Sequence, residues 1–473
     1  MPVEPQRVRK LNQKGHRTNG ARYVLYWAQM NRRAESNHGL LFAVELANQA
    51  NLPVLYYEAL TCSYPSANDR IHTFILEGVP DTGQRLHKLG IGYIFYLRRN
   101  REAPNDVLYQ LAREAAAVVT DDYPAFIARE HNSRVPERLD IAYYVVDSSC
   151  IVPMALLTKR EYGAYTIRPK LQKLLPTYRT PADPVRVKHS WRHSLPGRWH
   201  TEVTRESVAA LVADCEIDHS VKPSPTFTGG SARARKLLSH FLTNHLKHYA
   251  VRRNEPAAHA TSNLSPYLHF GHISALEVAL AAEDYAADHQ FSAAEFLDEL
   301  ITWRELALNY ARFATHSCRI EDLPEWCRLT MKQHARDKRE PCYSAAQFEE
   351  AATHDELWNA TQKEMLLRGK IHGYYRMYWG KKIIEWSNSY QSALDIMVQI
   401  HDRYALDGRD PNTYAGILWC FGLHDRPWFE RPVFGTLRYL SLDGMKRKTG
   451  TQAYIDEIRY LELTGKDPYK VPL

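Results

Sequence analysis

The stretch with the most unusual combination of side chains runs from Thr353 to Trp386. It carries three tryptophans and, between them, polar and thioether side chains: Trp358, Trp379, Trp386, His372, Arg376 and Met377. The periodicity predicts one helix over residues 357–386, in which Trp379 and Trp386 lie two turns apart on one face. Taken alone, this pattern favours a buried helix of a helical domain.

A second stretch, residues 261–274 (TSNLSPYLHFGHIS), combines hydroxyl side chains with a proline that favours a helix start. Thr261, Ser262 and Ser265 lie next to Pro266. Hydroxyls and free backbone N–H groups at a helix N-terminus suit a phosphate or pyrophosphate. An N-cap that serves only its own helix is the alternative, and the sequence leaves both open.

Three carboxylates fall where burial would need a reason. Glu299 and Trp303 are four residues apart, so they share a helix face. Capping or an ion pair to Arg304 is one explanation for the Glu299 carboxylate, and a polar contact to a bound heterocycle is the other. Asp407 and Asp410, in the turn DGRDPNTYAGILW, suit arginine partners or a ligand. Calcium fits poorly because the closing glutamate of an EF-hand loop is missing.

Composition limits the class of protein. The 473 residues predict two domains, and 44% hydrophobic with 24% charged residues is typical of a globular protein. The net charge of +7 and pI near 8.8 permit a polyanionic partner. Seven cysteines without a CxxC pair argue against a disulfide framework or a zinc site, and no metal is expected. No run is apolar enough to span a bilayer, and no signal peptide is recognised.

The elements that must position these residues form two parts. Strands near residues 21–28, 52–57, 91–97, 117–120 and 141–146 alternate with helices, which predicts a parallel α/β sheet over 21–175. It lacks GxGxxG and P-loop motifs. A proline-punctuated linker over 176–228, with one short helix near 207–213, precedes an all-helical domain over 229–473. Residues 1–20, basic and poor in apolar side chains, are predicted to be a disordered tail.

The ordered motifs together resemble the DNA photolyase and cryptochrome family. TSNLSPYLHFGHIS, DELITWREL, LWNATQKEMLLRGKIHGYYRMYW and DRYALDGRDPNTYAGILW carry the resemblance, which is strongest to class II cyclobutane pyrimidine dimer photolyases. HDRPWFERPVFGTLRY extends it, and FILEG, VVTD, IVPM and REYGAYTIRPK carry it into the first half. The resemblance covers about residues 20–465 and implies an α/β antenna domain joined by a linker to a helical FAD domain.

The resemblance implies FAD, active as FADH⁻, in the helical domain. Its ribityl and phosphate part would be held by Tyr249, Thr261, Ser262, Asn263, Leu264 and Ser265. Arg376 and Asp407 would pair beside the isoalloxazine, with Asp410 and Arg304 nearby. At the position facing flavin N5 the class II pattern has asparagine, whereas this chain has His401. The loop after Trp419 and the DSSC segment (residues 147–150) also depart from the usual sequence of the class II enzymes.

The implied activity is light-driven repair. Glu299, Trp303, Met377, Trp419 and Arg253 would line the pocket for a dimer flipped out of duplex DNA, and Arg252 with Arg253 would hold phosphates. Blue or near-UV light would drive an electron from FADH⁻ to the dimer, and the electron would return after the ring splits. A cryptochrome-like photoreceptor on the same scaffold, and a light-independent helical nucleic-acid-binding protein, are the alternatives.

By the same resemblance, a tryptophan triad would pass electrons to photo-oxidised flavin. Trp379 would lie nearest the flavin, Trp358 in the middle and Trp386 at the surface, with Tyr343 as a further member. A deazaflavin-type antenna is the family expectation for class II, and an empty antenna site is the alternative. A monomer that acts inside the cell, in cytoplasm or nucleus according to the organism, is expected.

Overall fold

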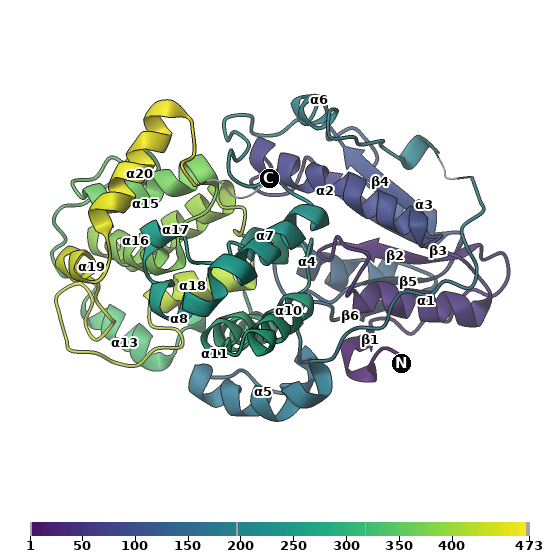
Figure 1. Ribbon diagram of the computed structural model, residues 1–473, viewed down its shortest axis with the longest axis horizontal. Helices are drawn as coiled ribbons and strands as arrows, with labels where there is room; N and C mark the ends of the chain where they lie inside the picture. The colour runs from purple at the N-terminus through teal and green to yellow at the C-terminus, as the bar shows by residue number, and fades with distance from the viewer. Residues whose placement is uncertain (1, 195–196, 317, 470–473) are drawn as a thin grey trace.

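The computed structural model describes residues 2–194, 197–316 and 318–469. Figure 1 shows a sheet with its flanking helices on one side of the molecule and a helical part on the other. This confirms the predicted α/β class with a helical second half. The boundaries at residues 20, 175 and 228 stay predictions, and residues 1, 195–196, 317 and 470–473 of the predicted tail, linker and helical domain lie outside the described residues.

The sheet has the strand order β1-β6-β5-β2-β3-β4. Its strands are β1 (Val8–Lys10), β2 (Tyr23–Ala28), β3 (Val54–Thr61), β4 (Gly92–Arg98), β5 (Ala115–Asp121) and β6 (Ala142–Val146). β2 to β6 are parallel, and β1 pairs with β6 in the antiparallel sense. Every residue of β2 is buried, because helices cover both faces of the sheet.

Four helices connect these strands: α1 (His38–Ala50), α2 (Asp69–Lys88), α3 (Val107–Ala112) and α4 (Phe126–Arg134). α1 and α2 share one hydrophobic cluster with Val24 and Tyr26, whereas α3 shares another with Leu25 and Trp27. Alternate residues of β2 therefore point to opposite cores, as the period of two along a strand requires.

The prediction of a disordered tail is wrong, because contacts with the sheet domain hold residues in both its first half and its second half. Arg7 is 1% exposed, and its side chain donates to the carbonyl oxygens of Cys150 and Ile151, at 2.9 and 2.7 Å. Arg9, on β1, binds both carboxylate oxygens of Asp122 at 2.8 Å. These basic residues form internal contacts with residues that are distant in the sequence, and composition alone cannot reveal such contacts.

Two helices come between the sheet and the helical part in the sequence: α5 (Ala164–Tyr178) and α6 (Val208–Ala213), of which α6 confirms the predicted short helix. The helical part comprises α7 (Ser231–Asn244), α8 (Tyr249–Arg252), α9 (Ser265–His269), α10 (Ala275–Asp288), α11 (Ala294–Leu297), a π-helical segment (Asp298–Trp303), α12 (Arg304–Phe313), α13 (Glu325–Gln333), α14 (Ala345–Glu349), α15 (Glu356–Arg368), α16 (Gly373–Trp386), α17 (Tyr390–Tyr404), α18 (Pro411–Cys420), α19 (Leu442–Lys448) and α20 (Thr451–Thr464).

The predicted single helix over 357–386 is wrong, because α15 and α16 are separate. Gly369 ends α15 in the left-handed conformation with φ +83°, which suits glycine, and a Cβ there would meet the Arg70 side chain at 2.9 Å. His372 is the N-cap of α16 rather than a residue inside a helix. The break places His372 and Arg376 at the start of α16.

Arg70 of α2 joins the two parts of the molecule. Its guanidinium donates to the carbonyl oxygens of Met365, Leu366 and Tyr404 at 2.9, 2.6 and 2.8 Å. Those carbonyls close the last turns of α15 and α17, where helix C-termini leave acceptors unpaired and favour a cation. Arg70 therefore holds the C-terminal ends of α15 and α17 against the α/β part of the molecule.

Candidate functional site

A cavity of about 420 Å³ opens between α8, the π-helical segment, α16 and α18. It brings together residues that are far apart in the sequence, and its lining includes seven of the predicted site residues: Tyr249, Arg253, Thr261, Glu299, Trp303, Met377 and Trp419. The sequence analysis missed His372 and Asn412 as lining residues, although both lie inside the recognised motifs. This size is typical of a pocket for a small molecule.

The π-helical segment presents Glu299 and Trp303 to this cavity. π-Helical turns are rare and frequently occur at functional sites. Arg168 of α5 braces the segment by binding both carboxylate oxygens of Asp298, at 2.8 and 2.9 Å. The irregular backbone that aims the two side chains is thus held from outside the cavity.

The Glu299 carboxylate forms its ion pair with Arg253, not with Arg304. Arg304 instead donates to the carbonyl oxygen of Ser149 at 2.6 Å, so the interpretation of Arg304 as the partner of Glu299 is wrong. The side chains of Arg253 and Glu299 are 30% and 41% exposed. A pair this accessible contributes little to stability and can be exchanged for a ligand.

Arg376 and Asp407 form the pair that the sequence analysis expected. Arg376 Nη2 lies 2.9 Å from Asp407 Oδ2, and the Ser265 hydroxyl donates to the same carboxylate at 2.7 Å. Burial would raise the pKa of Asp407, but the charges of Arg376 and Lys370 outweigh it and lower the pKa to about 2. The carboxylate is therefore charged at neutral pH.

The hydroxyl run does not cap its own helix. α9 has Leu264 at its N-cap position, without a side-chain cap hydrogen bond, while Ser265 serves Asp407. Thr261 lines the cavity, and Asn263 takes the left-handed conformation with φ +53°. The N-cap interpretation is wrong, and the phosphate interpretation stays a prediction.

Asp410 is held by contacts within the protein. It is the N-cap of α18 and accepts hydrogen bonds from the Asn412 N–H at 2.8 Å and the Tyr123 hydroxyl at 2.6 Å. His269 Nδ1 lies 3.1 Å from the same carboxylate. These contacts tie α18 to α9 and to the loop after β5, and a contact of Asp410 with a cofactor stays a prediction.

Several buried polar atoms in this region have no hydrogen-bond partner among the described residues. They are Nε of Arg376, Nε2 of His372 and both ring nitrogens of His401. Burial lowers the pKa of His401 to about 3, with the Arg376 charge adding to the effect, so its ring is neutral at pH 7. Unpaired buried polar groups are costly and need an explanation, and a bound heterocycle with polar edges would supply their partners.

Two cationic side chains lie over the indole of Trp419. Lys381 Nζ and Arg438 Cζ each lie 5.3 Å from its ring centroid. Lys381 is fully buried, donates to the Cys420 carbonyl oxygen at 2.6 Å, and has a pKa lowered by burial to about 8. Cations over the indole face fix the aromatic wall of the cavity.

Three indoles lie in contact in the order that the resemblance implies. The Trp379 and Trp358 rings are 6.4 Å apart and parallel within 5°, and the Trp358 and Trp386 rings are 6.2 Å apart. His401 packs edge-on against Trp379 at 4.9 Å. The expectation that Trp386 lies at the surface is wrong: it is 3% exposed, because Tyr343 and His354 pack over it.

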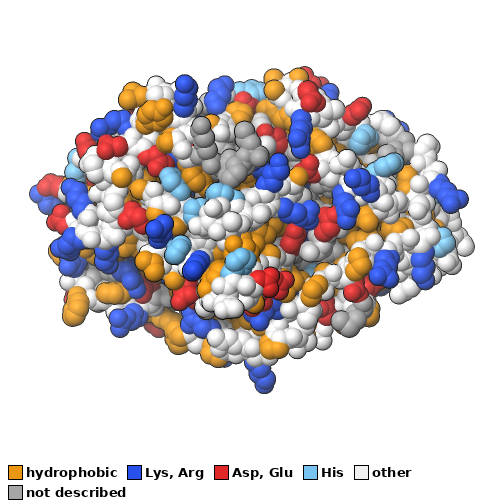
Figure 2. Space-filling view, in the orientation of Figure 1, with side chains coloured by type: hydrophobic (Ala, Val, Ile, Leu, Met, Phe, Trp, Pro, Cys, Tyr) orange, Lys and Arg blue, Asp and Glu red, His pale blue; other side chains and the backbone are white. Residues whose placement is uncertain are grey.

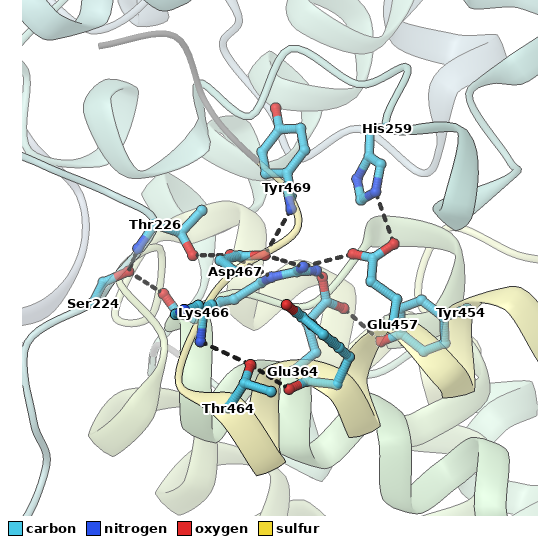
Figure 3. Close-up of polar contacts among 12 residues, drawn as sticks. Ser224, Thr226, His259, Glu364, Tyr454, Glu457, Thr464, Lys466, Asp467 and Tyr469 are labelled. Atoms are coloured by element: carbon cyan, nitrogen blue, oxygen red, sulfur yellow. Dashed lines mark hydrogen bonds and ion pairs between the residues drawn. The ribbon is translucent and has the colours of Figure 1, made fainter.

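Figure 3 shows a polar network around Glu457 and Asp467 that the sequence analysis missed. Arg368, 4% exposed, binds Glu457 and both carboxylate oxygens of Asp467. Two residues further on, the Tyr469 hydroxyl accepts a hydrogen bond from Asn263 at 2.8 Å, and its ring stacks on His259 at 4.5 Å. Arg368 and Asp467 lie 99 positions apart, and Asn263 and Tyr469 lie 206 apart, so no local pattern could reveal these contacts.

The face of the molecule drawn in Figure 2 carries both charges: Lys and Arg side chains are spread over it with acidic side chains among them. Arg252 is exposed, as a phosphate contact requires. Among the described residues, no cluster of three His, Cys, Asp or Glu side chains is placed to hold a metal ion. Within the same ranges, no helix has the length and apolar character needed to cross a bilayer.

Comparison with known proteins finds relatives that are all named as photolyases. A DNA photolyase family model matches residues 24–188. The chain is 39% identical over 460 residues to the deoxyribodipyrimidine photo-lyase of Methanothermobacter thermautotrophicus, and the match covers 97% of this chain and 99% of the relative. The enzyme of the same name from Arabidopsis thaliana is 36% identical, with 94% and 91% covered, and that from Potorous tridactylus 33%, with 94% and 82% covered.

Solved structures share the fold at low sequence identity. A class III photolyase from Agrobacterium tumefaciens superposes with a TM-score of 0.69 at 17% identity, covering 95% of this chain and 89% of that one. A Synechocystis cryptochrome gives 0.67 at 14% identity, covering 93% and 89%.

Proposed function

This chain belongs to the DNA photolyase family, and we propose that it is a class II photolyase that repairs cyclobutane pyrimidine dimers in DNA under blue or near-UV light. The observation that carries the proposal is the cavity lined by Glu299, Trp303, Met377 and Trp419. It combines aromatic walls, a thioether and a carboxylate, which suit two fused, non-planar pyrimidine rings with polar edges.

FAD is the cofactor that we propose for this site. The residues that would hold it are Tyr249, residues 261–265, Arg376, Asp407 and His401. Arg304 and Asp410 would lie nearby. The unpaired buried atoms of Arg376, His372 and His401 support the fit. Reduced FAD, when bound and excited by light, supplies an electron that splits the dimer and recovers it afterwards. The protein contributes position and electrostatics.

The side chains of the cavity would act on the dimer by contact. Trp303 and Trp419 would pack against its rings, and Met377 would fill the space between them. Glu299 would exchange its ion pair with Arg253 for a hydrogen bond to a pyrimidine edge. Arg253, thus released, would join Arg252 in contacting DNA phosphates, which positions the duplex without reading its sequence. Flipping the dimer out costs about a few kcal/mol, and less for a damaged pair.

The tryptophan triad would supply electrons when the cofactor is oxidised. The stacked pair Trp379 and Trp358 supports this role, because their short separation and parallel rings favour electron transfer. His401 would stand between the cofactor and Trp379 as a neutral ring. Its ring nitrogens, unpaired among the described residues, would offer a hydrogen bond to the cofactor.

Three further features belong to the proposal. We expect a deazaflavin-type antenna in the sheet domain, tested by a second chromophore that copurifies from a host that makes deazaflavins. We expect the protein to bind damaged duplex DNA as a monomer, which sedimentation with and without DNA checks. Its proposed substrate places it inside the cell, in cytoplasm or nucleus according to the organism.

The decisive experiment illuminates the chemically reduced protein with dimer-containing DNA and follows the regain of pyrimidine absorbance. Matched samples kept dark, or given undamaged DNA, serve as controls. Absorbance that recovers only with light and dimers supports the proposal. Bound, reduced FAD without repair would refute it and favour the cryptochrome-like photoreceptor, and a colourless protein that binds DNA would favour the light-independent alternative.

A further inference from the structure

We propose that Tyr343 and His354 form the solvent end of the aromatic chain, where His354 takes the phenolic proton as Tyr343 gives its electron to oxidised Trp386. This inference rests on the proposed photochemistry of the site. It assigns a proton acceptor, His354, and it makes a neutral tyrosyl radical, rather than an indole radical, the end product of electron transfer.

The phenol of Tyr343 makes two hydrogen bonds with the same histidine. Its oxygen lies 2.7 Å from His354 Nδ1 and accepts the backbone N–H of His354 at 3.0 Å. Because the oxygen already accepts this N–H, its own hydrogen is free to point at Nδ1. We therefore assign the tautomer with the hydrogen on Nε2. The two rings are nearly parallel, within 16°, and the separation of 2.7 Å between the phenol oxygen and Nδ1 makes the proton path short.

Both residues contact the outermost indole directly. Trp386 is 3% exposed, with the Tyr343 ring 5.8 Å and the His354 ring 4.8 Å from its own, centroid to centroid. The Tyr343 N–H also donates to the Trp386 carbonyl oxygen at 3.0 Å, and this backbone hydrogen bond holds Tyr343 against the indole. Since the ring of Trp386 is sealed from water, Tyr343 and His354 are its route to solvent, and His354 itself is exposed.

The surroundings of Trp386 disfavour a positive charge on its ring. Lys382 Nζ lies 5.5 Å from the ring centroid and its side chain is 7% exposed. Glu385 pairs with Lys382 at 2.6 Å and offsets part of this charge. A buried cation attracts a neutral indole but repels an oxidised one. Oxidised Trp386 is thus destabilised, which favours electron transfer to it from Tyr343, a residue that can lose a proton.

The step balances as one electron and one proton. The initial oxidant would be photoexcited, oxidised flavin. It would draw an electron from Trp386 through Trp358 and Trp379, and Trp386 is then left oxidised. Tyr343 gives one electron to oxidised Trp386, which becomes an ordinary indole again. The O–H bond of Tyr343 breaks, and its proton forms an N–H bond at His354 Nδ1. The products are a neutral tyrosyl radical and an imidazolium, which passes a proton to water.

The test is a flash experiment on the holoprotein with oxidised FAD and no added reductant, followed by transient absorption and electron paramagnetic resonance. We expect a neutral tyrosyl radical whose formation is slower in D2O. In His354→Gln, it should form about a hundredfold more slowly, the usual effect of removing a positioned base. In Tyr343→Phe, the radical should stay on tryptophan.

Chemical rescue separates a proton acceptor from a merely structural residue. Imidazole in the buffer should restore the rate in His354→Ala, because the site is open to solvent. His289→Gln is the matched control: His289 also stacks on a tyrosine, Tyr285, at 4.0 Å, but its Nδ1 contacts the Tyr285 carbonyl oxygen and not a phenol. This variant should behave as wild type.

A tryptophan radical as the end product in wild type would overturn the inference, as would an unchanged rate in His354→Gln or no rescue by imidazole. Repair by the same wild-type preparation, started with chemically reduced cofactor, tests the proposed function separately. That assay needs no electron from Tyr343. Repair without a tyrosyl radical therefore refutes only this inference, whereas a tyrosyl radical without repair refutes only the proposed repair activity.

Discussion

Replacing Asp407 by asparagine should lower the free energy of unfolding by about 3 kcal/mol at pH 7, because it leaves Arg376 buried without a countercharge. The two side chains are only 6% and 14% exposed, and their charged atoms lie 2.9 Å apart. Asparagine keeps the shape of the side chain and can still accept the Ser265 hydroxyl. The change therefore removes the charge and little else.

The pH dependence follows from the lowered pKa of Asp407. Its pKa is about 2 in the folded protein against an ordinary 3.8, so ionisation contributes about 2 kcal/mol of stability. Because the folded value lies below the unfolded one, this contribution is complete above about pH 5 and is lost as the pH falls toward 2. The stability gap between wild type and Asp407→Asn should be constant near neutrality and narrow in acid.

The assay is urea unfolding followed by tryptophan fluorescence, at pH 7 and at several lower values. Asp140→Asn is the control, since both carboxylate oxygens of Asp140 also pair with an arginine, Arg17, but its side chain is 79% exposed. Its loss should cost less than about 1 kcal/mol. An Asp407→Asn protein as stable as this control, or a gap that does not change in acid, would refute the reasoning.

Three further predictions concern the site itself. Glu299→Gln should slow repair by chemically reduced protein about tenfold, because a charged hydrogen bond to the dimer is weakened. It should change the free energy of unfolding by less than about 1 kcal/mol, because the ion pair of Glu299 is half exposed. The repair yield and the urea midpoint measure these two effects. Trp358→Phe should strongly slow light-driven reduction of oxidised FAD, seen by transient absorption. His401→Asn should change the lifetime of the light-reduced state, whereas wild type should show no titration of this step between about pH 5 and pH 8, because His401 stays neutral there.

Much of the site could be predicted from motif residues that lie close together in the chain. Arg376 and Met377 are adjacent, and Glu299 and Trp303 share a face of a helical segment, so recognising the motif also indicated how the side chains would be presented. The pairing of Arg376 with Asp407 followed from the resemblance and agrees with the geometry. The roles of these residues stay predictions.

Other features depended on contacts that the sequence does not display. The partner of Glu299 is Arg253, 46 positions away, rather than the nearby Arg304. Trp386 is buried because Tyr343, which belongs to a distant loop, is folded against it. Local patterns cannot rank such partners, because a charge or an aromatic ring has many candidates at similar sequence distance.

The sequence by itself determined the secondary structure that repeats with a regular period: the five parallel strands of the sheet and most helices of the second half. Periodicity is a local property, so it survives without knowledge of the fold. The tertiary structure alone decided which charges are neutralised and which residues cover the outermost indole. These outcomes depend on burial, and burial is set by residues that meet only after the chain has folded.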